Sequence, residues 1–253
     1  MSAVEEKLAA SLTASTTELV PYLPYLLQDL WEMGSSPTDI LELIAGNTVV
    51  STETRVLDLG CGKGAVSIRL AQELGCSVTG IDLMPEFIAY ARSKAQEYGV
   101  EAQCRFEVGD INESVKYERA YDIVILGAVG DVLGDSLETI LNLSATVRPG
   151  GYIFIDDAYG ADGGDARYHS RDQWLGVFAA AKVRLVAEKI VDPRDVVATN
   201  TFTQDHITKR ADELAAMHPE KARMFEEYVK CQQAECDELE NEMTGVTLLL
   251  QTA

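Results

Sequence analysis

The sequence predicts an α/β protein with a doubly wound, Rossmann-like sheet whose strands are mostly parallel. From Arg55 onward, short apolar runs of strand character alternate with helical segments. Such alternation is typical of parallel strands joined by right-handed helical crossovers. Residues 56–64 (VLDLGCGKG) also read as a buried strand that enters a glycine turn and then a helix. A turn of this kind brings the backbone against a nucleoside-containing ligand at the carboxyl end of the sheet.

The boundaries of the elements follow from proline and glycine. One helix is expected to end at Leu74 before Gly75, and the next to begin at Pro85 and to stop at Gly99. Proline in the first turn and glycine after the last turn are usual helix boundaries. Strands are expected at 76–82, before 108, and at 121–126, 147–156, 183–191 and 246–250, with further helices at 135–146 and 171–181.

Two helical additions are expected outside this alternation. Residues 1–46 form a helical cap, broken by prolines in its first part and closed by a helix that Ser36 caps and that ends at about Ala45, before Gly46. Residues 201–242 form a helical pair between the sixth and seventh strands, because apolar residues recur there at helical spacing. We expect a single domain over 1–253, with cap 1–46, core 47–200 and 243–253, and insertion 201–242, a size that suits one α/β domain.

Composition excludes several classes of function. The chain has 41 acidic and 21 basic residues and a formal charge of −20, which leaves little basic surface for a nucleic-acid backbone. No apolar run reaches membrane length, so a cytoplasmic location is expected. Five cysteines without close-set pairs predict free thiols and no metal site. A small molecule is therefore the expected partner, with no nucleic acid and no membrane, and a homodimer is left open.

The glycine turn narrows the type of ligand. Dinucleotide-binding turns have the spacing G-x-G-x-x-G, whereas this chain has G-x-G-x-G with Asp58 two positions before the first glycine. This spacing resembles motif I of the class I S-adenosylmethionine (SAM)-dependent methyltransferases. The segments 76–82, 108–111, 121–126 and 147–156 resemble later motifs of that family, in the same order. SAM carries an ammonium and a sulfonium but no phosphate, so a nearby carboxylate such as Asp58 is favourable.

The resemblance implies a seven-stranded sheet with a reversed last strand, SAM as the cofactor, and methyl transfer to a small molecule by in-line displacement. Asp82 would accept hydrogen bonds from the ribose hydroxyls and Asp110 would bind the adenine. The implied cofactor-binding residues are Asp58, Gly60, Cys61, Gly62, Gly64, Asp82, Leu83, Asp110, Ile111 and Gly127. Two of these residues also have a structural alternative. Asp110 can be a helix N-cap, and Cys61 can be a small turn residue.

The acceptor site is less defined. Active residues collect at the carboxyl ends of strands, which makes Asp131, Asp157 and Tyr159 catalytic candidates. Tyr22, Tyr25 and Trp31 of the N-terminal section are candidates for the substrate pocket, with core packing as the alternative. No catalytic residue is assigned, and no metal is expected. Two other functions stay open: a non-catalytic or regulatory SAM-binding protein, and an NAD-dependent oxidoreductase, against which the glycine spacing speaks.

Overall fold

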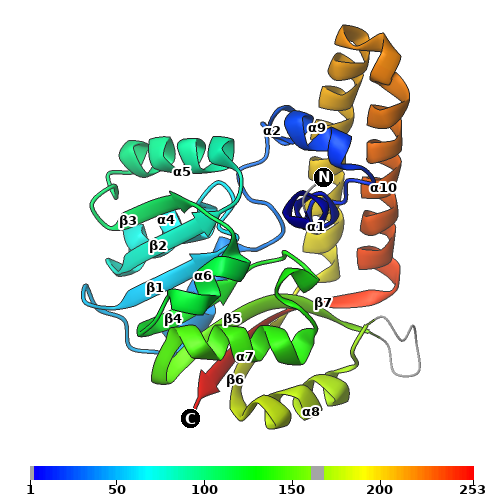
Figure 1. Ribbon diagram of the computed structural model, residues 1–253. Helices are drawn as coiled ribbons and strands as arrows, with labels where there is room; N and C mark the ends of the chain where they lie inside the picture. The colour runs from blue at the N-terminus through cyan, green and yellow to red at the C-terminus, as the bar shows by residue number, and fades with distance from the viewer. Residues whose placement is uncertain (1–2, 161–167) are drawn as a thin grey trace. The chain divides into compact units, whose positions relative to one another are not determined.

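The computed structural model describes residues 3–160 and 168–253 (Figure 1). Its described residues divide into two compact units. An α/β unit comprises Trp31–Tyr159, His169–Ile190 and Val246–Ala253. A helical unit takes its residues from Met1–Leu30, Gly160–Tyr168 and Val191–Gly245. The domain boundaries expected from the sequence remain predictions.

The α/β unit is built on a seven-stranded sheet, as predicted. Its strands are β1 (Arg55–Leu59), β2 (Ser77–Asp82), β3 (Cys104–Val108), β4 (Tyr121–Leu126), β5 (Val147–Gly160), β6 (Val183–Ile190) and β7 (Met243–Thr252). Their spatial order is β3-β2-β1-β4-β5-β7-β6. Strands β1 to β5 pair in parallel, whereas β7 runs antiparallel to β6. The reversed last strand is therefore confirmed.

Helices cover both faces of this sheet. They are α3 (Pro37–Asn47), α4 (Ala65–Leu74), α5 (Pro85–Glu97), α6 (Ile111–Tyr117), α7 (Ser136–Thr146) and α8 (Arg171–Ala181), with the short η2 (Asp131–Leu133) after β4. Buried residues of α3, α4 and α5 pack with Val56 on one face, whereas those of α6, α7 and α8 pack with Leu57 on the other. Because both faces are covered, the central strands are apolar on both sides.

The end of helix α3 differs from the prediction. The helix was expected to stop before Gly46, but it continues through Gly46 to Asn47. Its first turn is as predicted, since the Ser36 hydroxyl accepts a hydrogen bond of 3.2 Å from the Asp39 N–H. Glycine weakens a helix interior without forbidding it. Here Thr48 is the C-cap that follows the helix, and its N–H still donates to the Ile44 carbonyl.

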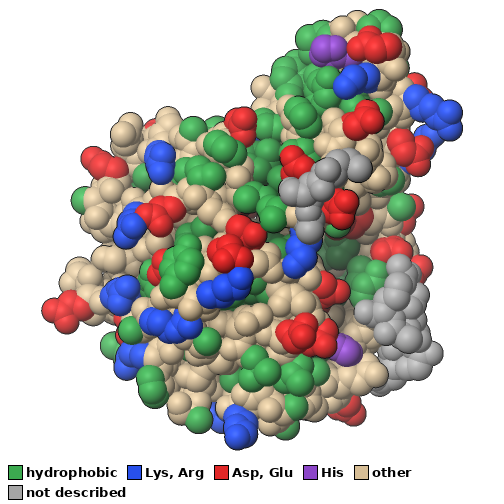
Figure 2. Space-filling view, in the orientation of Figure 1, with side chains coloured by type: hydrophobic (Ala, Val, Ile, Leu, Met, Phe, Trp, Pro, Cys, Tyr) green, Lys and Arg blue, Asp and Glu red, His purple; other side chains and the backbone are tan. Residues whose placement is uncertain are grey.

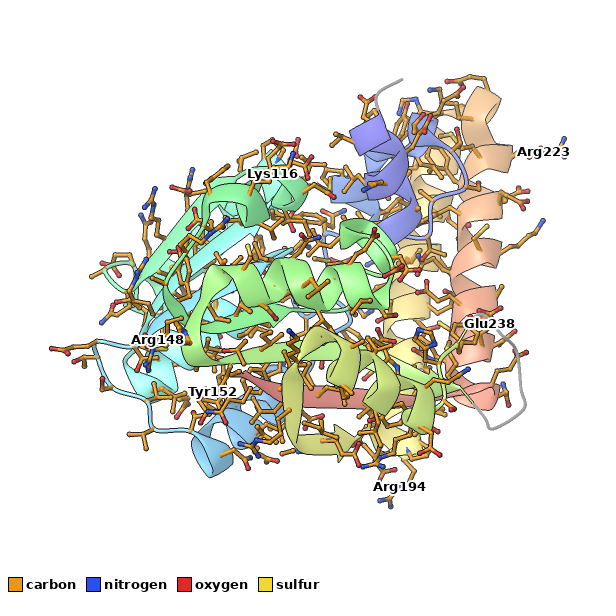
Figure 3. The ribbon with its side chains drawn as sticks, turned by 60° about the horizontal axis from the view of Figure 1, so that its bottom comes forward. Lys116, Arg148, Tyr152, Arg194, Arg223 and Glu238 are labelled. Atoms are coloured by element: carbon orange, nitrogen blue, oxygen red, sulfur yellow. The ribbon has the colours of Figure 1, made fainter. Side chains whose placement is uncertain are left out.

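The helical unit contains α1 (Ala3–Ser11), η1 (Thr17–Tyr22), α2 (Leu23–Leu26), α9 (Pro193–Met217), η3 (Pro219–Lys221) and α10 (Ala222–Asn241). Helix α9 begins eight residues earlier than the expected insertion at Thr201. Asp192 caps it by accepting a hydrogen bond from the Arg194 N–H at 2.8 Å, and Pro193 occupies its first turn. Arg194 and Arg223 project from this unit into solvent (Figure 3).

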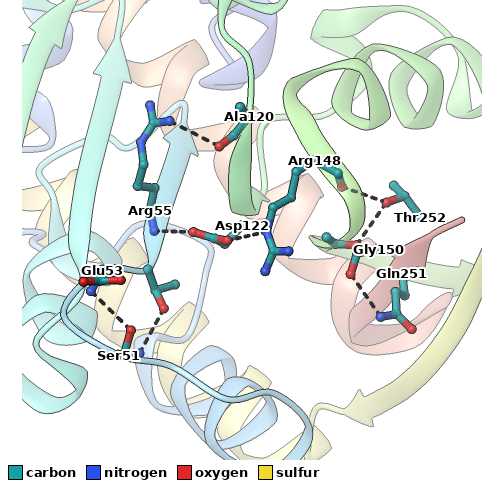
Figure 4. A network of polar contacts seen from close by, with 11 residues as sticks. Ser51, Glu53, Arg55, Ala120, Asp122, Arg148, Gly150, Gln251 and Thr252 are labelled. Carbon is teal, nitrogen blue, oxygen red and sulfur yellow. Dashed lines mark hydrogen bonds and ion pairs between the residues drawn. The ribbon is translucent and has the colours of Figure 1, made fainter.

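The amino-terminal edge of the sheet is held by polar contacts (Figure 4). Asp122 on β4 accepts a hydrogen bond of 2.7 Å from the Arg55 N–H and also pairs with Arg148. Gln251 on β7 donates to the Gly150 carbonyl at 3.0 Å. These contacts lie at the amino-terminal ends of the parallel strands, away from the glycine turn. They therefore stabilise the sheet and do not form part of the candidate site.

Acidic and basic side chains are interspersed over the face that Figure 2 shows. This distribution fits the low basic content of the chain, 21 basic residues against 41 acidic ones. Among the described residues, no helix is both long and apolar enough to cross a membrane.

Candidate functional site

The glycine turn follows β1 directly and leads into α4. Gly60, Gly62 and Gly64 have φ values of +70°, +51° and +78°, which L side chains rarely adopt. The N–H groups of Gly60 and Cys61 both donate to the Ile81 carbonyl, at 2.8 and 3.1 Å. The turn is therefore fixed to the end of β2, at the carboxyl ends of the strands, where Gly60 and Cys61 are half-buried and Gly62 and Gly64 are buried.

Asp82 stands at the tip of β2 and is bonded to this turn. Its Oδ2 accepts the Gly62 N–H at 2.8 Å, and its Oδ1 accepts the Met84 N–H at 2.9 Å. Burial raises the pKa of Asp82, while the backbone donors of Met84, Gly62 and Leu83 oppose that rise. Each carboxylate oxygen has two lone pairs, so both can accept one further hydrogen bond from a ligand. Leu83, the next residue, is half-buried.

Asp58 lies inside the α/β unit rather than at its surface. The residue is 3% exposed, and its Oδ2 accepts a hydrogen bond of 2.6 Å from the Ser67 hydroxyl on α4. Burial raises its pKa to about 6, and the nearby carboxylates of Asp82 and Asp156 raise it further. The hydrogen bond from Ser67 acts in the opposite direction and lowers the pKa. This carboxylate therefore anchors the helix that follows the glycine turn, and its contact with a cofactor stays a prediction.

Asp110 and Ile111 follow β3, which pairs with β2. Asp110 caps α6 by accepting a hydrogen bond of 2.8 Å from the Asn112 N–H, and the adjoining Gly109 N–H donates to the Asp82 carbonyl at 2.9 Å. Ile111 is buried. The structure thus shows the capping role of Asp110 and also brings its segment beside Asp82, where a nucleoside would need a second polar group.

The remaining residues of the predicted cofactor site are Cys61 and Gly127. Burial raises the pKa of the Cys61 thiol well above its usual range, and the carboxylates of Asp58 and Asp82 raise it further. A thiol that stays protonated is a poor nucleophile, which favours the reading of Cys61 as a small turn residue. A β-carbon on Gly127 would lie 2.6 Å from the Ser35 hydroxyl oxygen, so a larger residue there would require the Ser35 side chain to move.

The three catalytic candidates have different surroundings. Asp131 is exposed at the start of η2. Asp157 is exposed as a residue, yet surrounding protein desolvates its carboxyl group and raises its pKa to about 6, with Asp131 contributing. Tyr159 is buried and donates a hydrogen bond of 2.6 Å to Glu188, which also binds Arg171 at 2.9 Å. The hydroxyl of Tyr159 therefore has a structural partner.

The candidate pocket aromatics fall in different units. Tyr22 in the helical unit packs edge-on against His218 and Phe225, with ring centroids 5.5 and 5.1 Å apart. Tyr25 in the same unit donates a hydrogen bond of 2.8 Å to Glu213. Both tyrosines thus have partners within the helical unit, and their place in a substrate pocket stays a prediction.

Trp31 belongs to the α/β unit and contacts the glycine turn. Its indole N–H donates to the Lys63 carbonyl at 3.1 Å. Sequence reasoning placed Trp31 near a pocket but missed its neighbours Met33 and Ser35, which also lie against the site. Neither residue type carries a recognisable signal, because their importance depends on which turns the chain places beside them.

Asp156 lies in the second half of β5. Its Oδ1 accepts a hydrogen bond of 2.6 Å from the Thr247 hydroxyl on β7. Its Oδ2 is shielded from solvent, and among the described residues no donor has the geometry of a hydrogen bond to it. Burial raises the pKa of Asp156, whereas the nearby Ser35 and Thr247 hydroxyls favour the ionised form. No group of three His, Cys, Asp or Glu residues in the described ranges could hold a metal ion.

Comparison with known proteins places this arrangement in a family. Residues 51–209, more than half of the chain, match the family model described as a methyltransferase domain. A ubiquinone biosynthesis O-methyltransferase of Aeromonas salmonicida is 36% identical over 101 residues, which are 40% of this chain and 42% of that protein. The chain thus spans about two fifths of the length of the curated relatives that it matches.

Solved structures extend the likeness in fold over nearly the whole chain. A SAM-dependent methyltransferase of Thiobacillus denitrificans, in complex with S-adenosylhomocysteine, has a TM-score of 0.76 and 18% identity, and the match covers 92% of this chain and 98% of that one. The corresponding complex from Geobacter sulfurreducens has a TM-score of 0.76 and 20% identity, with 91% and 97% covered. With the family model spanning the glycine turn and the strands around it, the chain belongs to the methyltransferase-domain family.

Proposed function

We propose that the protein is a SAM-dependent methyltransferase that acts on a small molecule. The observation that carries this proposal is the joint geometry of Asp82 and the glycine turn. The turn keeps backbone free of side chains at the carboxyl end of β1, and the Asp82 carboxylate is bonded to Gly62 while retaining capacity to accept two more hydrogen bonds. An adenosine offers two ribose hydroxyls that match this capacity.

Each residue of the site then has a task. Asp82 would bind the ribose, Asp110 and Ile111 would line the base, and the turn at Gly60 and Gly62 would face the methionine end. When bound, SAM would supply a methyl group on a sulfonium, which is already an activated leaving group. The protein's contribution is to align the two reactants and to exclude water.

The acceptor is proposed to be a small molecule with an attacking oxygen. The O-methyltransferases among the relatives support an oxygen acceptor, and the charge of −20 disfavours a phosphate backbone. Asp157, whose pKa desolvation raises to about 6, is the candidate that we propose for taking the proton, whereas the hydroxyl of Tyr159 is already bonded to Glu188. A cytoplasmic location of the protein stays a prediction, and a homodimer stays open.

Calorimetry with S-adenosylhomocysteine tests the cofactor assignment. Asp82→Ala removes the acceptor of two ribose hydrogen bonds, each worth roughly 1.5 to 3 kcal/mol, so the affinity should fall by about two to four orders of magnitude. The matched control is Glu73→Ala, an acid on the surface of α4 that forms an ion pair with Arg69. Unchanged affinity in a folded Asp82→Ala protein would contradict the assignment.

Turnover separates an enzyme from a protein that only binds the nucleoside. Methyl-labelled SAM incubated with a panel of small hydroxylated compounds should give labelled product with the wild-type protein and none with Asp82→Ala. Tight binding without transfer to any compound would favour the regulatory alternative. The oxidoreductase alternative is set aside, because the glycine spacing and the family both point elsewhere.

A further inference from the structure

A short segment of the α/β unit lies directly against the glycine turn. We call residues 31–35 the strap. At its start, the Trp31 indole N–H donates to the Lys63 carbonyl at 3.1 Å. At its end, the Ser35 hydroxyl accepts a hydrogen bond from the Ala128 N–H at 3.3 Å. The strap is thus tied to the turn after β1 and to the turn after β4, the two turns between which a ligand at the carboxyl ends of these adjacent strands would lie.

Glycines lie at the contacts between the strap and the two turns. A β-carbon on Gly62 would lie 2.8 Å from the terminal methyl carbon of Met33. One on Gly127 would lie 2.6 Å from the Ser35 oxygen, and one on Gly34 would lie 2.6 Å from the Ala128 β-carbon. Three glycines therefore stand at the places where the strap and the two turns meet. The strap is therefore closely packed against both turns.

A tight turn directs the strap's side chains. The Ser35 N–H donates to the Met33 carbonyl at 3.1 Å, and Gly34 between them has a φ of +82°. A three-residue turn with a positive φ at its centre is rare, and glycine adopts this φ without a side-chain clash. It places the Met33 side chain against Gly62 while its other end keeps Ser35 at the turn after β4.

We propose that Met33 is an internal competitor of the cofactor, and that its side chain occupies the space of the cofactor's methionine end when no ligand is bound. This inference rests on the proposed function, which puts that end of SAM at Gly62. The Met33 side chain suits the role because it is itself a flexible thioether with three rotatable bonds. Cofactor binding then requires the strap to withdraw Met33 from the glycine turn.

Ser35 of the strap also lies beside Asp156 on β5. Burial raises the pKa of Asp156, and the hydrogen bonds of the Ser35 and Thr247 hydroxyls oppose that rise. The closed strap is therefore in contact with β5 as well as with the two turns.

Calorimetry with S-adenosylhomocysteine provides the test, comparing wild type with Met33→Ala, Met33→Leu and Met217→Ala. If the closed strap leaves only a minor fraction of the protein competent to bind, truncation of Met33 should raise the affinity by about fivefold or more. Leucine fills nearly the same volume, so Met33→Leu should stay near wild type. Met217 is an exposed methionine of the helical unit, and its truncation should change nothing.

A second measurement follows the displacement directly. In protein labelled at the methionine methyl groups, the Met33 signal is identified by its loss in Met33→Ala, and it should shift when S-adenosylhomocysteine is added. Equal or weaker binding by Met33→Ala, or a Met33 signal that does not move on saturation, would overturn the competitor role and leave the proposed function standing. Binding by neither wild type nor Met33→Ala would overturn both, whereas binding by Met33→Ala alone would support both.

Discussion

The Ser67 hydroxyl donates a hydrogen bond of 2.6 Å to Asp58 Oδ2, and this contact joins helix α4 to strand β1 in the interior of the α/β unit. Burial raises the pKa of Asp58 from its usual 3.8 to about 6. Between these two values the folded protein binds more protons at this site than the unfolded chain does. This site's contribution to the free energy of unfolding is therefore full below pH 4 and is lost as the pH rises through 6.

Replacing this carboxyl group should flatten the pH dependence of stability. In Asp58→Asn the side-chain oxygen still accepts from Ser67, but no charge has to be buried. The difference in unfolding free energy between wild type and variant should change by about 2 to 3 kcal/mol between pH 4 and pH 7 in favour of the variant. Urea unfolding at several pH values measures it, with exposed Asp131→Asn as control. Parallel curves for wild type and Asp58→Asn would contradict the buried-charge account.

Gly46→Ala should stabilise the protein. Gly46 lies in α3 near its end, its φ is not positive, and a β-carbon there would have no atom within 4 Å. Alanine should therefore gain about 0.5 to 1 kcal/mol in unfolding free energy. The control is Gly99→Ala, which is equally open but has a φ of +68° and should lose about 1 to 2 kcal/mol instead. Thermal melting of both variants decides the point, and a loss in Gly46→Ala would show that this helix needs its glycine.

Asp122→Ala should lower stability without changing ligand binding. Asp122 accepts from the Arg55 N–H at 2.7 Å and pairs with Arg148 at the amino-terminal edge of the sheet. The Arg55 N–H is exposed, so water can replace the lost acceptor, and the cost is about 0.5 to 1.5 kcal/mol. Because this edge lies at the far end of the strands from Asp82, the affinity for S-adenosylhomocysteine should be that of wild type. A fall in affinity in the folded variant would show that the two edges are coupled.

Tyr159→Phe tests whether a catalytic candidate is structural. The variant keeps the buried ring and loses the hydrogen bond of 2.6 Å to Glu188, which costs about 1 kcal/mol. Chemical denaturation should show this loss, whereas the matched change Tyr117→Phe at an exposed position should have no effect. Full stability of Tyr159→Phe combined with loss of methyl transfer would instead assign Tyr159 to the reaction.

Much of this architecture could be predicted because its signals are local. The helix end at Gly75 and the start at Pro85 depend on neighbours in sequence, and both lie where expected. The start of α9 at Pro193 had the same kind of signal in Asp192, but the apolar spacing that marked the insertion begins only at Ile207. The start of α9 is therefore set by the Asp192 cap and Pro193, even though its first turns lack an apolar stripe.

The candidate site could be predicted only in part, for a physical reason. Asp82 and the glycines belong to a contiguous motif, whereas Ser67 is recognisable as a partner of Asp58 only once helix α4 has folded back onto β1. The contacts of Met33 and Ser35 depend on a tight turn at Gly34 and on two other turns far along the chain. Contacts between such distant segments cannot be predicted from residue spacing in the sequence.

Strand β7 is the last of the sheet in sequence but lies between β5 and β6 in space. During synthesis, β5 and β6 are made before β7. The edges of β5 and β6 that pair with β7 in the folded protein therefore stay unpaired while the long helices α9 and α10 are made. Exposed edges of this kind invite pairing with other chains, and pairing over such sequence separations is slow. The final strand therefore acts as a closing step for the whole sheet, and the nascent chain is most open to aggregation in the interval before residue 252 leaves the ribosome.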